Sequence, residues 1–191
     1  MRTQHPEPSP VSAGSCLPAS VAGRVFQSAA LVRYSAIALC ATLAATSALA
    51  GVKVGDSFPD LASFKLEGKI PDALKGKVVM VDFWASWCEP CKQSFPAMEE
   101  LHRRFSDKGL VIVAINVDEN RADMDGFLKK NAADFAVLRD GAQKLVAKAG
   151  IATMPSSFLL DRDGKIRFIH TGYRGAETRK KYEEEIETLL K

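Results

Sequence analysis

The sequence has little net charge and few cysteines. Its 191 residues hold 26 Lys and Arg against 23 Asp and Glu, with four Cys. A net charge of +3, scattered along the chain, is too small for the basic patch of a nucleic-acid binder. Four cysteines are too few for a small domain held together by disulfides. The hydrophobic content of 47% excludes a disordered chain, so we expect one ordinary globular domain and an additional segment.

Acidic residues and lysine are almost missing from the first fifty residues, which contain no Asp, no Lys and a single Glu. Arg33 precedes an apolar run at 37–45, and the small residues at 48–50 fit an A-x-A cleavage site. A positive flank, a short apolar stretch and small residues in this order are typical of a secretory signal peptide. We therefore predict a leader at residues 1–50 and an exported domain at 51–191.

An uncleaved membrane anchor is the alternative for this leader. Its apolar part, 34–50, is at the short limit for crossing a bilayer, and Ser and Thr dilute it. We therefore favour cleavage at the end of this stretch, which would make the protein periplasmic. Cleavage removes Cys16 and Cys40, and it leaves Cys88 and Cys91 as a neighbouring pair.

Along the rest of the chain, continuous apolar runs alternate with segments whose apolar residues recur at helical spacing. Apolar runs, and a hairpin around an Asp-Gly turn, predict strands at 62–66, 78–84, 110–117, 136–138, 156–161 and 165–171. Apolar residues at helical spacing predict helices at 91–105, 122–131 and 142–149, and a last one with Tyr182 and Ile186 inward. This order predicts an α/β fold in which a central mixed sheet is flanked by helices on both faces.

The two remaining cysteines stand between a predicted buried strand and a helix, in the segment Trp87-Cys88-Glu89-Pro90-Cys91. Thiols three residues apart on one helical turn come within disulfide distance. Cys88 begins the helix, where backbone N–H groups and the helix dipole favour a thiolate, so its pKa is expected to be lowered. Cys91 is expected to be more buried. This asymmetry favours exchange chemistry, in which Cys88 attacks a disulfide and Cys91 resolves the intermediate.

Three other uses of the pair fit the sequence less well. A zinc site needs about four ligands, and beyond the leader the pair is accompanied by two His besides carboxylates. Covalent haem attachment requires a histidine directly after the second cysteine, where this chain has Lys92. A purely structural disulfide across so short a loop constrains the unfolded chain little. We therefore predict a redox-active pair with no metal and no cofactor.

A longer pattern surrounds the pair. It comprises the segment 81–92, with the letters VDFWASWCEPCK, then Pro96 in the following helix and Thr153-Met154-Pro155 farther along. Together these residues resemble the active-site segment, the helix-bending proline and the cis-proline loop of the thioredoxin superfamily. The inserted helix and strand within 122–138, the export signal and the Glu-Pro dipeptide resemble the TlpA/ResA-like branch of thiol–disulfide oxidoreductases. The resemblance implies a thioredoxin-like fold for residues 51–191.

Two positions depart from that branch. Its members often carry Asn where this chain has Asp82, and Glu where it has Ser94. The carboxylate instead occupies the position of the buried aspartate of thioredoxin. Burial in an apolar strand disfavours the ionised form, so the pKa of Asp82 is expected to be raised and the carboxyl could exchange a proton with Cys91. The alternative is a polar residue linked to solvent with no part in catalysis.

The resemblance also implies a substrate surface beside the first cysteine. A cis bond before Pro155 would leave the Met154 backbone free to pair with an extended substrate, and an ordinary trans turn is the alternative. Trp87 is expected at the rim of this surface. Glu89 and Pro90, between the cysteines, complete it, with Glu89 exposed and tuning the reduction potential of the pair.

Other conspicuous side chains receive structural interpretations. We expect Trp84 to pack in the core, His102 to lie near the apolar seam of the active-site helix, and His170 to be a surface residue. The charged run at 179–185 is interpreted as the solvated face of the last helix, supported by pairs four residues apart.

We predict an exported reductase of protein disulfides, whose substrates and partners are protein thiols and disulfides. The resemblance implies a membrane thiol donor that re-reduces the pair in an oxidising compartment, and a role in cytochrome c maturation. We expect a monomer that binds no nucleic acid.

Three alternatives stay open. A disulfide-donating oxidase of the DsbA type would carry a large helical insertion before the cis-proline loop, and this chain lacks one. A copper chaperone of the same fold would resemble a C-x-x-x-C pair with a distant His, whereas this spacing is C-x-x-C. A peroxidase would not need Cys91 at this position.

Overall fold

The computed structural model describes residues 51–191, and a five-stranded sheet lies at their centre. The strand order is β3-β2-β1-β4-β5, with parallel pairs β1–β2 and β2–β3 and antiparallel pairs β1–β4 and β4–β5. The strands are β1 Val78–Trp84, β2 Leu110–Asn116, β3 Ala136–Arg139, β4 Ser156–Leu160 and β5 Ile166–Thr171. The predicted mixed sheet is thus confirmed, whereas the predicted leader at 1–50 lies outside the described residues.

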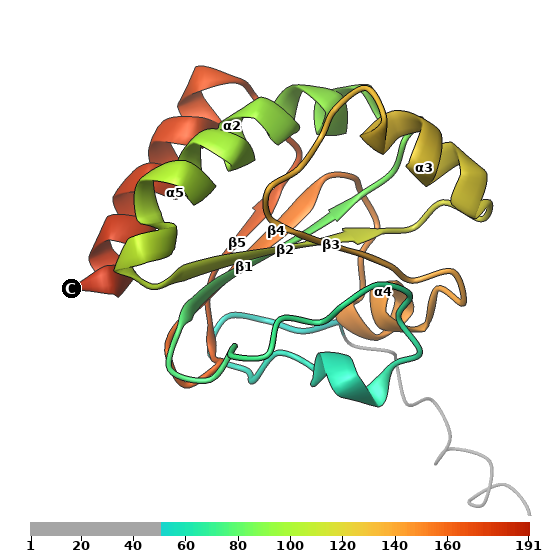
Figure 1. Ribbon diagram of the computed structural model, residues 1–191. Coiled ribbons are helices and arrows are strands. Elements are labelled where there is room, and N and C mark those ends of the chain that lie inside the picture. The colour runs from blue at the N-terminus through green and yellow to red at the C-terminus, as the bar shows by residue number, and fades with distance from the viewer. Residues whose placement is uncertain (1–50) are drawn as a thin grey trace, which may run out of the picture. The chain divides into compact units, whose positions relative to one another are not determined.

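Helices cover both faces of this sheet, as predicted (Figure 1). They are α2 Glu89–Phe105, α3 Arg121–Leu128, α4 Lys144–Ala149 and α5 Ala176–Leu190, with short 3-10 helices at Leu61–Ser63 and Ser106–Lys108. In Figure 1, α2 and α5 lie above the sheet, and α4 lies below it with the segment 51–77. Within residues 51–191, no helix is long and apolar enough to cross a membrane.

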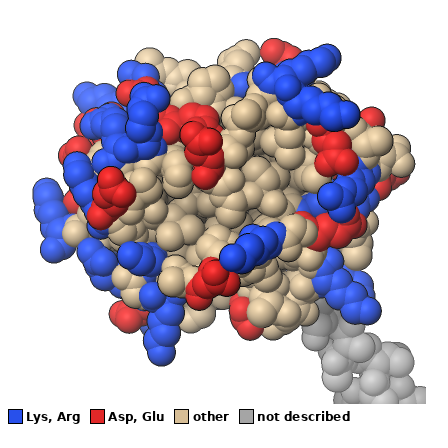
Figure 2. Space-filling model, viewed as in Figure 1, with Lys and Arg blue, Asp and Glu red and all other residues tan. Residues whose placement is uncertain are grey.

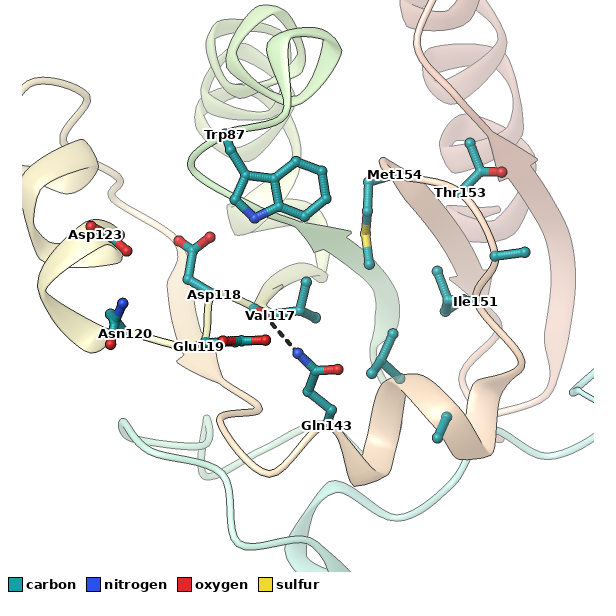
Figure 3. A pocket seen from close by; sticks show the side chains of 13 residues that line it. Trp87, Val117, Asp118, Glu119, Asn120, Asp123, Gln143, Ile151, Thr153 and Met154 are labelled. Carbon is teal, nitrogen blue, oxygen red and sulfur yellow. Dashed lines mark hydrogen bonds between the residues drawn. The ribbon is translucent and has the colours of Figure 1, made fainter. Parts of the chain in front are cut away.

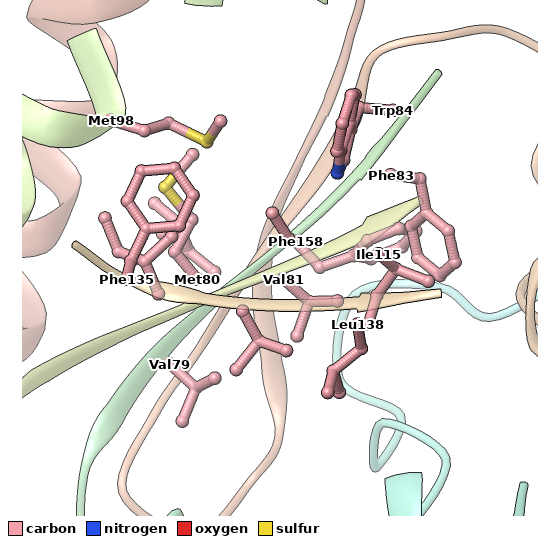
Figure 4. Close-up of a cluster of buried hydrophobic side chains, with 14 of the residues drawn as sticks. Val79, Met80, Val81, Phe83, Trp84, Met98, Ile115, Phe135, Leu138 and Phe158 are labelled. Carbon is pink, nitrogen blue, oxygen red and sulfur yellow. The ribbon is translucent and has the colours of Figure 1, made fainter. Parts of the chain in front are cut away.

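The central strand, β1, is buried along its whole length. Successive side chains of a strand point to opposite faces. Trp84 therefore packs against Phe95 of α2, with ring centroids 4.7 Å apart, whereas Phe83 packs against Phe58 on the other side. Figure 4 shows Trp84 and Phe83 within the cluster of buried side chains. Such aromatic pairs contribute about 0.5–1.5 kcal/mol each beyond their buried area. They fix the end of β1, from which the chain runs directly to the cysteine pair.

The strand expected at 62–66 is wrong. Leu61–Ser63 forms a 3-10 helix, because the Asp60 side chain accepts a hydrogen bond from the Ala62 N–H at 3.1 Å. Aspartate favours such local bonds over an extended strand. The segment 51–77 therefore covers the lower face of the sheet largely as a loop, with two isolated bridges, Ser57 to Lys165 and Glu67 to Arg139 of β3.

The helix expected at 142–149 begins two residues later than its apolar spacing indicates. Gln143 has a φ of 52°, a left-handed conformation that a helix cannot include. Asp140 then accepts hydrogen bonds from the backbone N–H groups of Lys144 and Val146, at 3.1 and 2.9 Å. The carboxylate thus caps α4 and sets where it begins.

Candidate active site

Cys88 and Cys91 form a disulfide at the start of α2, with Cα atoms 5.3 Å apart. Cys88 is the N-cap residue of the helix, and its Sγ accepts a hydrogen bond from the Cys91 N–H at 3.3 Å. The side chain of Cys88 is 5% exposed, whereas that of Cys91 is fully buried, as expected. A thiolate at Cys88 would keep this N–H donor and face the positive end of the helix dipole. Incoming groups therefore reach Cys88 first.

A buried carboxylate holds the loop between β1 and the pair. Asp118 follows β2 and is 2% exposed. Both of its oxygens accept from the Ser86 N–H, at 3.1 and 3.2 Å, and Oδ2 also accepts from Asn116 Nδ2 at 2.9 Å. Sequence reasoning missed this residue. Its signal was polar Asn-x-Asp at the carboxyl end of a strand parallel to β1, where the loops of the two strands meet.

The second buried carboxylate, Asp82, lies within β1 on the face covered by the upper helices. Burial raises its pKa to about 7, and a hydrogen bond from Ser157 opposes that rise. Ser157, its register partner on β4, donates to Oδ1 at 2.5 Å. Within residues 51–191, Oδ2 has no hydrogen-bond partner. The expected rise in pKa is confirmed, and one oxygen is available to hold a proton.

A tyrosine and a histidine extend this polar group across the sheet. Ser157 Oγ lies 2.7 Å from Tyr182 Oη, which reaches down from α5. His170 of β5 packs edge-on against the Tyr182 ring, and its Nε2 lies 2.6 Å from Glu185 Oε2. The expectation that His170 is a surface residue is therefore wrong, because α5 covers it. The signal missed here was a tyrosine in a buried helix stripe, whose hydroxyl needs a partner.

The predicted cis-proline loop, with Met154 and Pro155, is the next part of the site. The bond between Met154 and Pro155 is cis, as expected, and the Pro155 carbonyl accepts from the Gly172 N–H at 2.8 Å. Met154 is half-buried and, together with Trp87, lines a pocket of about 830 Å³. Figure 3 shows the two side chains at the upper edge of this pocket. Trp87 is 70% exposed, so its ring lies at the molecular surface and not in the core.

Acidic side chains line one edge of the pocket, and no Lys or Arg lines it. Asp118, Glu119 and Asp123 lie on the side of α3, opposite Met154 (Figure 3). On the face of the molecule seen in Figure 2, side chains of both charge signs are interspersed around a largely uncharged centre. A ligand in this pocket would meet apolar surface at its floor and negative charge at one edge.

Arg139 holds the backbone at two of these acids, Asp118 and Glu119. Arg139 Nε donates to the Asp118 carbonyl at 3.1 Å, and its terminal nitrogens bond the Glu119 carbonyl and the Glu67 carboxylate. Arg139 is almost fully buried, so its charge requires these acceptors. The segment 51–77 is thereby tied to the edge of the pocket.

The remaining predicted residues lie at the surface or against the core. Glu89 is exposed and pairs with Lys92 at 3.0 Å, and Pro90 occupies the first turn of α2, where a missing N–H costs no hydrogen bond. His102 is half-buried against Phe135. Among residues 51–191, no three His, Cys, Asp or Glu side chains are grouped as metal ligands.

Comparison with known proteins identifies this arrangement. The pattern of the Redoxin family matches residues 53–186. The chain belongs to the Redoxin family. Among curated relatives, the thiol-disulfide oxidoreductase ResA of Bacillus thuringiensis (strain Al Hakam) is 36% identical over 117 residues, covering 60% of this chain and 68% of that protein. ResA of Geobacillus thermodenitrificans (strain NG80-2) is 33% identical over 138 residues, covering 71% and 79% respectively.

A solved structure agrees with these relatives. The putative thiol:disulfide interchange protein DsbE from Chlorobium tepidum superposes with a TM-score of 0.68 at 37% identity, covering 74% of this chain and 100% of its own. This Redoxin protein is therefore a TlpA/ResA-like member of the thioredoxin superfamily, with a thioredoxin-like fold. It is a protein thiol–disulfide oxidoreductase, and its substrates are protein thiols and disulfides.

Proposed function

We propose that this oxidoreductase works as a reductase of protein disulfides, with Cys88 as the attacking and Cys91 as the resolving residue. The observation that carries the roles of the two cysteines is the asymmetry of the pair, and the direction of transfer rests on the resemblance to the TlpA/ResA-like branch. Cys88 begins a helix, accepts a backbone hydrogen bond and retains some exposure, whereas Cys91 is buried behind it. A nucleophile must be reached by the substrate, and a resolving thiol must be kept from it.

The exchange consumes one substrate disulfide and oxidises the pair. The Cys88 thiolate attacks one sulfur of the substrate disulfide, and the other substrate sulfur leaves as a thiolate. Cys91 then loses its proton and attacks Cys88 Sγ, which breaks the mixed disulfide and releases the second substrate sulfur. Two electrons pass to the substrate, and Cys88 and Cys91 end as a disulfide, the state in which the structure holds them.

Asp82 is proposed to take the proton from Cys91. Its pKa of about 7 places the carboxyl between its two protonation states near neutral pH. A group with such a pKa both accepts and returns a proton efficiently at that pH. The unpartnered Oδ2 supplies the position for the proton.

The substrate segment is proposed to lie between Trp87 and the cis-proline loop. Met154 would pair its backbone with an extended chain, beside Pro155, while Glu89 and Pro90 face the same partner. A side chain next to the substrate cysteine would enter the pocket of about 830 Å³. The acidic edge of that pocket favours substrates with a positive charge near the cysteine.

The site of action is proposed to be the periplasm. This rests on the predicted leader at residues 1–50, with an uncleaved anchor as the alternative. A reductant there is re-oxidised at each turnover, so a membrane thiol donor must return electrons to it. By its resemblance to the TlpA/ResA-like branch, the protein is proposed to act in cytochrome c maturation, as a monomer.

Insulin reduction tests the proposed roles of the two cysteines. We expect Cys88→Ala to abolish turnover and Cys91→Ala to accumulate mixed disulfides, because only the latter retains the attacking thiol. Trapped adducts are counted by mass spectrometry, and Cys91→Ala serves as the matched control for the loss of a disulfide. Turnover in Cys88→Ala would overturn the assignment.

The reduction potential of the pair tests the direction of transfer. A value near about −270 mV resembles that of thioredoxin and supports a reductase. A value near about −120 mV resembles that of DsbA and would instead support an oxidase. Equilibration with glutathione or dithiothreitol buffers, followed by thiol counting, measures it.

A further inference from the structure

A row of polar side chains crosses three neighbouring strands in one register. Asp82 of β1 is paired with Ser157 of β4, and Ser157 is paired with His170 of β5. Register partners on adjacent strands point to the same face of a sheet, so the three side chains lie side by side. That face is covered by α5, from which Tyr182 and Glu185 reach the row.

The protons in this row have a defined order when Asp82 is ionised. A carboxylate is an acceptor only, so the single hydroxyl proton of Ser157 points to Asp82 Oδ1, at 2.5 Å. Ser157 Oγ must then accept from Tyr182 Oη, at 2.7 Å. Within residues 51–191, Ser157 is the one hydrogen-bond partner of that phenol. The order Tyr182 to Ser157 to Asp82 therefore stabilises the charged carboxylate.

We propose that Ser157 and Tyr182 are positioning residues of the redox reaction, which hold Oδ1 of Asp82 in a two-hydroxyl relay and leave Oδ2 as the acceptor of the Cys91 proton. The inference rests on the proposed role of Asp82 and deepens it. Hydrogen bonds in series polarise one another, so Tyr182 acts on Asp82 through Ser157 without touching it. Neither residue contacts the substrate or the sulfurs in this role.

Few charged groups face the row from the elements packed around it. On the β2 side the register partner of Asp82 is Ala114, which is apolar. From β5 and α5 come His170 and Glu185, which bind each other at 2.6 Å. Other titratable groups on these elements include the cysteine pair at the start of α2 and Tyr173, which precedes α5. Two exposed ion pairs join α2 and α5: Arg104–Glu183 and Arg179–Glu100. The relay is thus the direct polar contact of Asp82.

The pH dependence of the resolving step tests this proposal in the full chain. The reduced protein is mixed with an excess of a chromophoric aryl disulfide, whose second released thiolate reports the attack of Cys91 on the mixed disulfide. For Ser157→Ala we expect the midpoint of the pH–rate profile to rise by about one pH unit, because a charged group loses one hydrogen bond. Tyr182→Phe should move it in the same direction by less, and Ser157→Thr should restore it.

One further variant separates the possible causes. His170→Gln keeps a hydrogen-bond donor toward Glu185 and should leave the midpoint unchanged, and a shift in this variant would assign the pH dependence to the histidine instead. Should Ser157→Ala fail to fold, Tyr182→Phe alone decides, because it removes one oxygen and keeps the ring packing.

A rate that falls equally at every pH, with the midpoint unmoved, would overturn the relay and leave a structural role. That outcome is distinct from failure of the proposed function. If the midpoint is unmoved in Ser157→Ala and Tyr182→Phe while the Asp82→Asn profile differs from the wild type, Asp82 keeps its role and the relay alone is rejected. Insulin turnover by Cys88→Ala would instead reject the proposed function itself.

Discussion

One buried carboxylate, Asp82, lies within β1 and another, Asp118, directly follows the neighbouring strand β2, and their surroundings differ. Asp118 is 2% exposed, and N–H donors from Ser86 and Asn116 engage both of its oxygens. Asp82 is fully buried, with one hydroxyl donor on Oδ1 and none on Oδ2. The donors around a buried carboxyl, more than burial itself, decide its use. Asp118 is saturated and holds a loop, whereas Asp82 is left able to exchange a proton.

The effect of Asp82 on stability has a definite sign. Its pKa is about 7 in the folded protein, against 3.8 for an ordinary aspartate. Between these values the native state binds the proton more tightly than the unfolded chain does. The free energy of unfolding therefore falls as pH rises from about 4 to about 7, and stays lower above that.

The largest effect is expected from Asp82→Asn above neutral pH. Removing the buried charge should raise the free energy of unfolding at pH 8 by up to about 4 kcal/mol, the equivalent of the pKa difference. At pH 4 the gain should vanish, because the native carboxyl is then neutral. Urea unfolding of the oxidised protein at the two pH values measures both. Equal gains at both pH values would contradict a raised pKa.

The same substitution at the other carboxylate should act in the opposite direction. Asp118→Asn replaces an acceptor oxygen by an NH2 group next to the Ser86 or Asn116 donors. We expect a loss of about 1–3 kcal/mol in the free energy of unfolding at pH 8, because a buried donor loses its acceptor. Urea unfolding under the conditions used for Asp82→Asn provides the comparison, and a stabilised Asp118→Asn would break the contrast between the two sites.

A smaller effect is expected where the pocket meets the substrate. Trp87→Ala should raise KM for a peptide disulfide about fivefold, the equivalent of about 1 kcal/mol, with the free energy of unfolding nearly unchanged because the ring is 70% exposed. Val54→Ala is the matched control, since Val54 is also a large exposed apolar residue and lies outside the pocket. Steady-state kinetics measure the change, and an equal rise in both variants would remove Trp87 from the substrate surface.

The smallest effect concerns the exposed acids of the pocket. Glu119→Gln combined with Asp123→Asn should lower kcat/KM for a substrate with a lysine beside its cysteine about twofold to threefold at low salt. A substrate with glutamate in that place serves as the control and should gain slightly. No difference between the two substrates would show that the acidic edge does not select charge.

Local pattern predicted much of this architecture. Apolar runs predicted the strands of the sheet, and helical spacing predicted that Phe95 and Ile186 point inward. Both predictions succeed because the residues of one buried face recur at short, regular intervals in the sequence. The cysteine pair was visible for the same reason. The 3-10 helix at Leu61–Ser63 was missed, because a single Asp60 cap outweighed the apolar pattern.

The polar partners escaped prediction for a different reason. Asp82 and Ser157 are 75 residues apart in sequence, and Ser86 and Asp118 are 32 apart. Which side chains meet depends on which strands are neighbours and in what register, and neither is recorded in local spacing. Asp82 was recognised because it interrupts an apolar strand, whereas Ser157 is compatible with any strand.

One measurement tests the central claim that Asp82 takes the proton of Cys91. The rate at which Cys91 resolves a Cys88 mixed disulfide is followed between about pH 5 and pH 9, in the wild type and in Asp82→Asn. The account predicts a wild-type profile governed by a group with a pKa of about 7, and a variant that lacks this group and is slowest relative to the wild type near neutral pH. Identical profiles in the two proteins would contradict it.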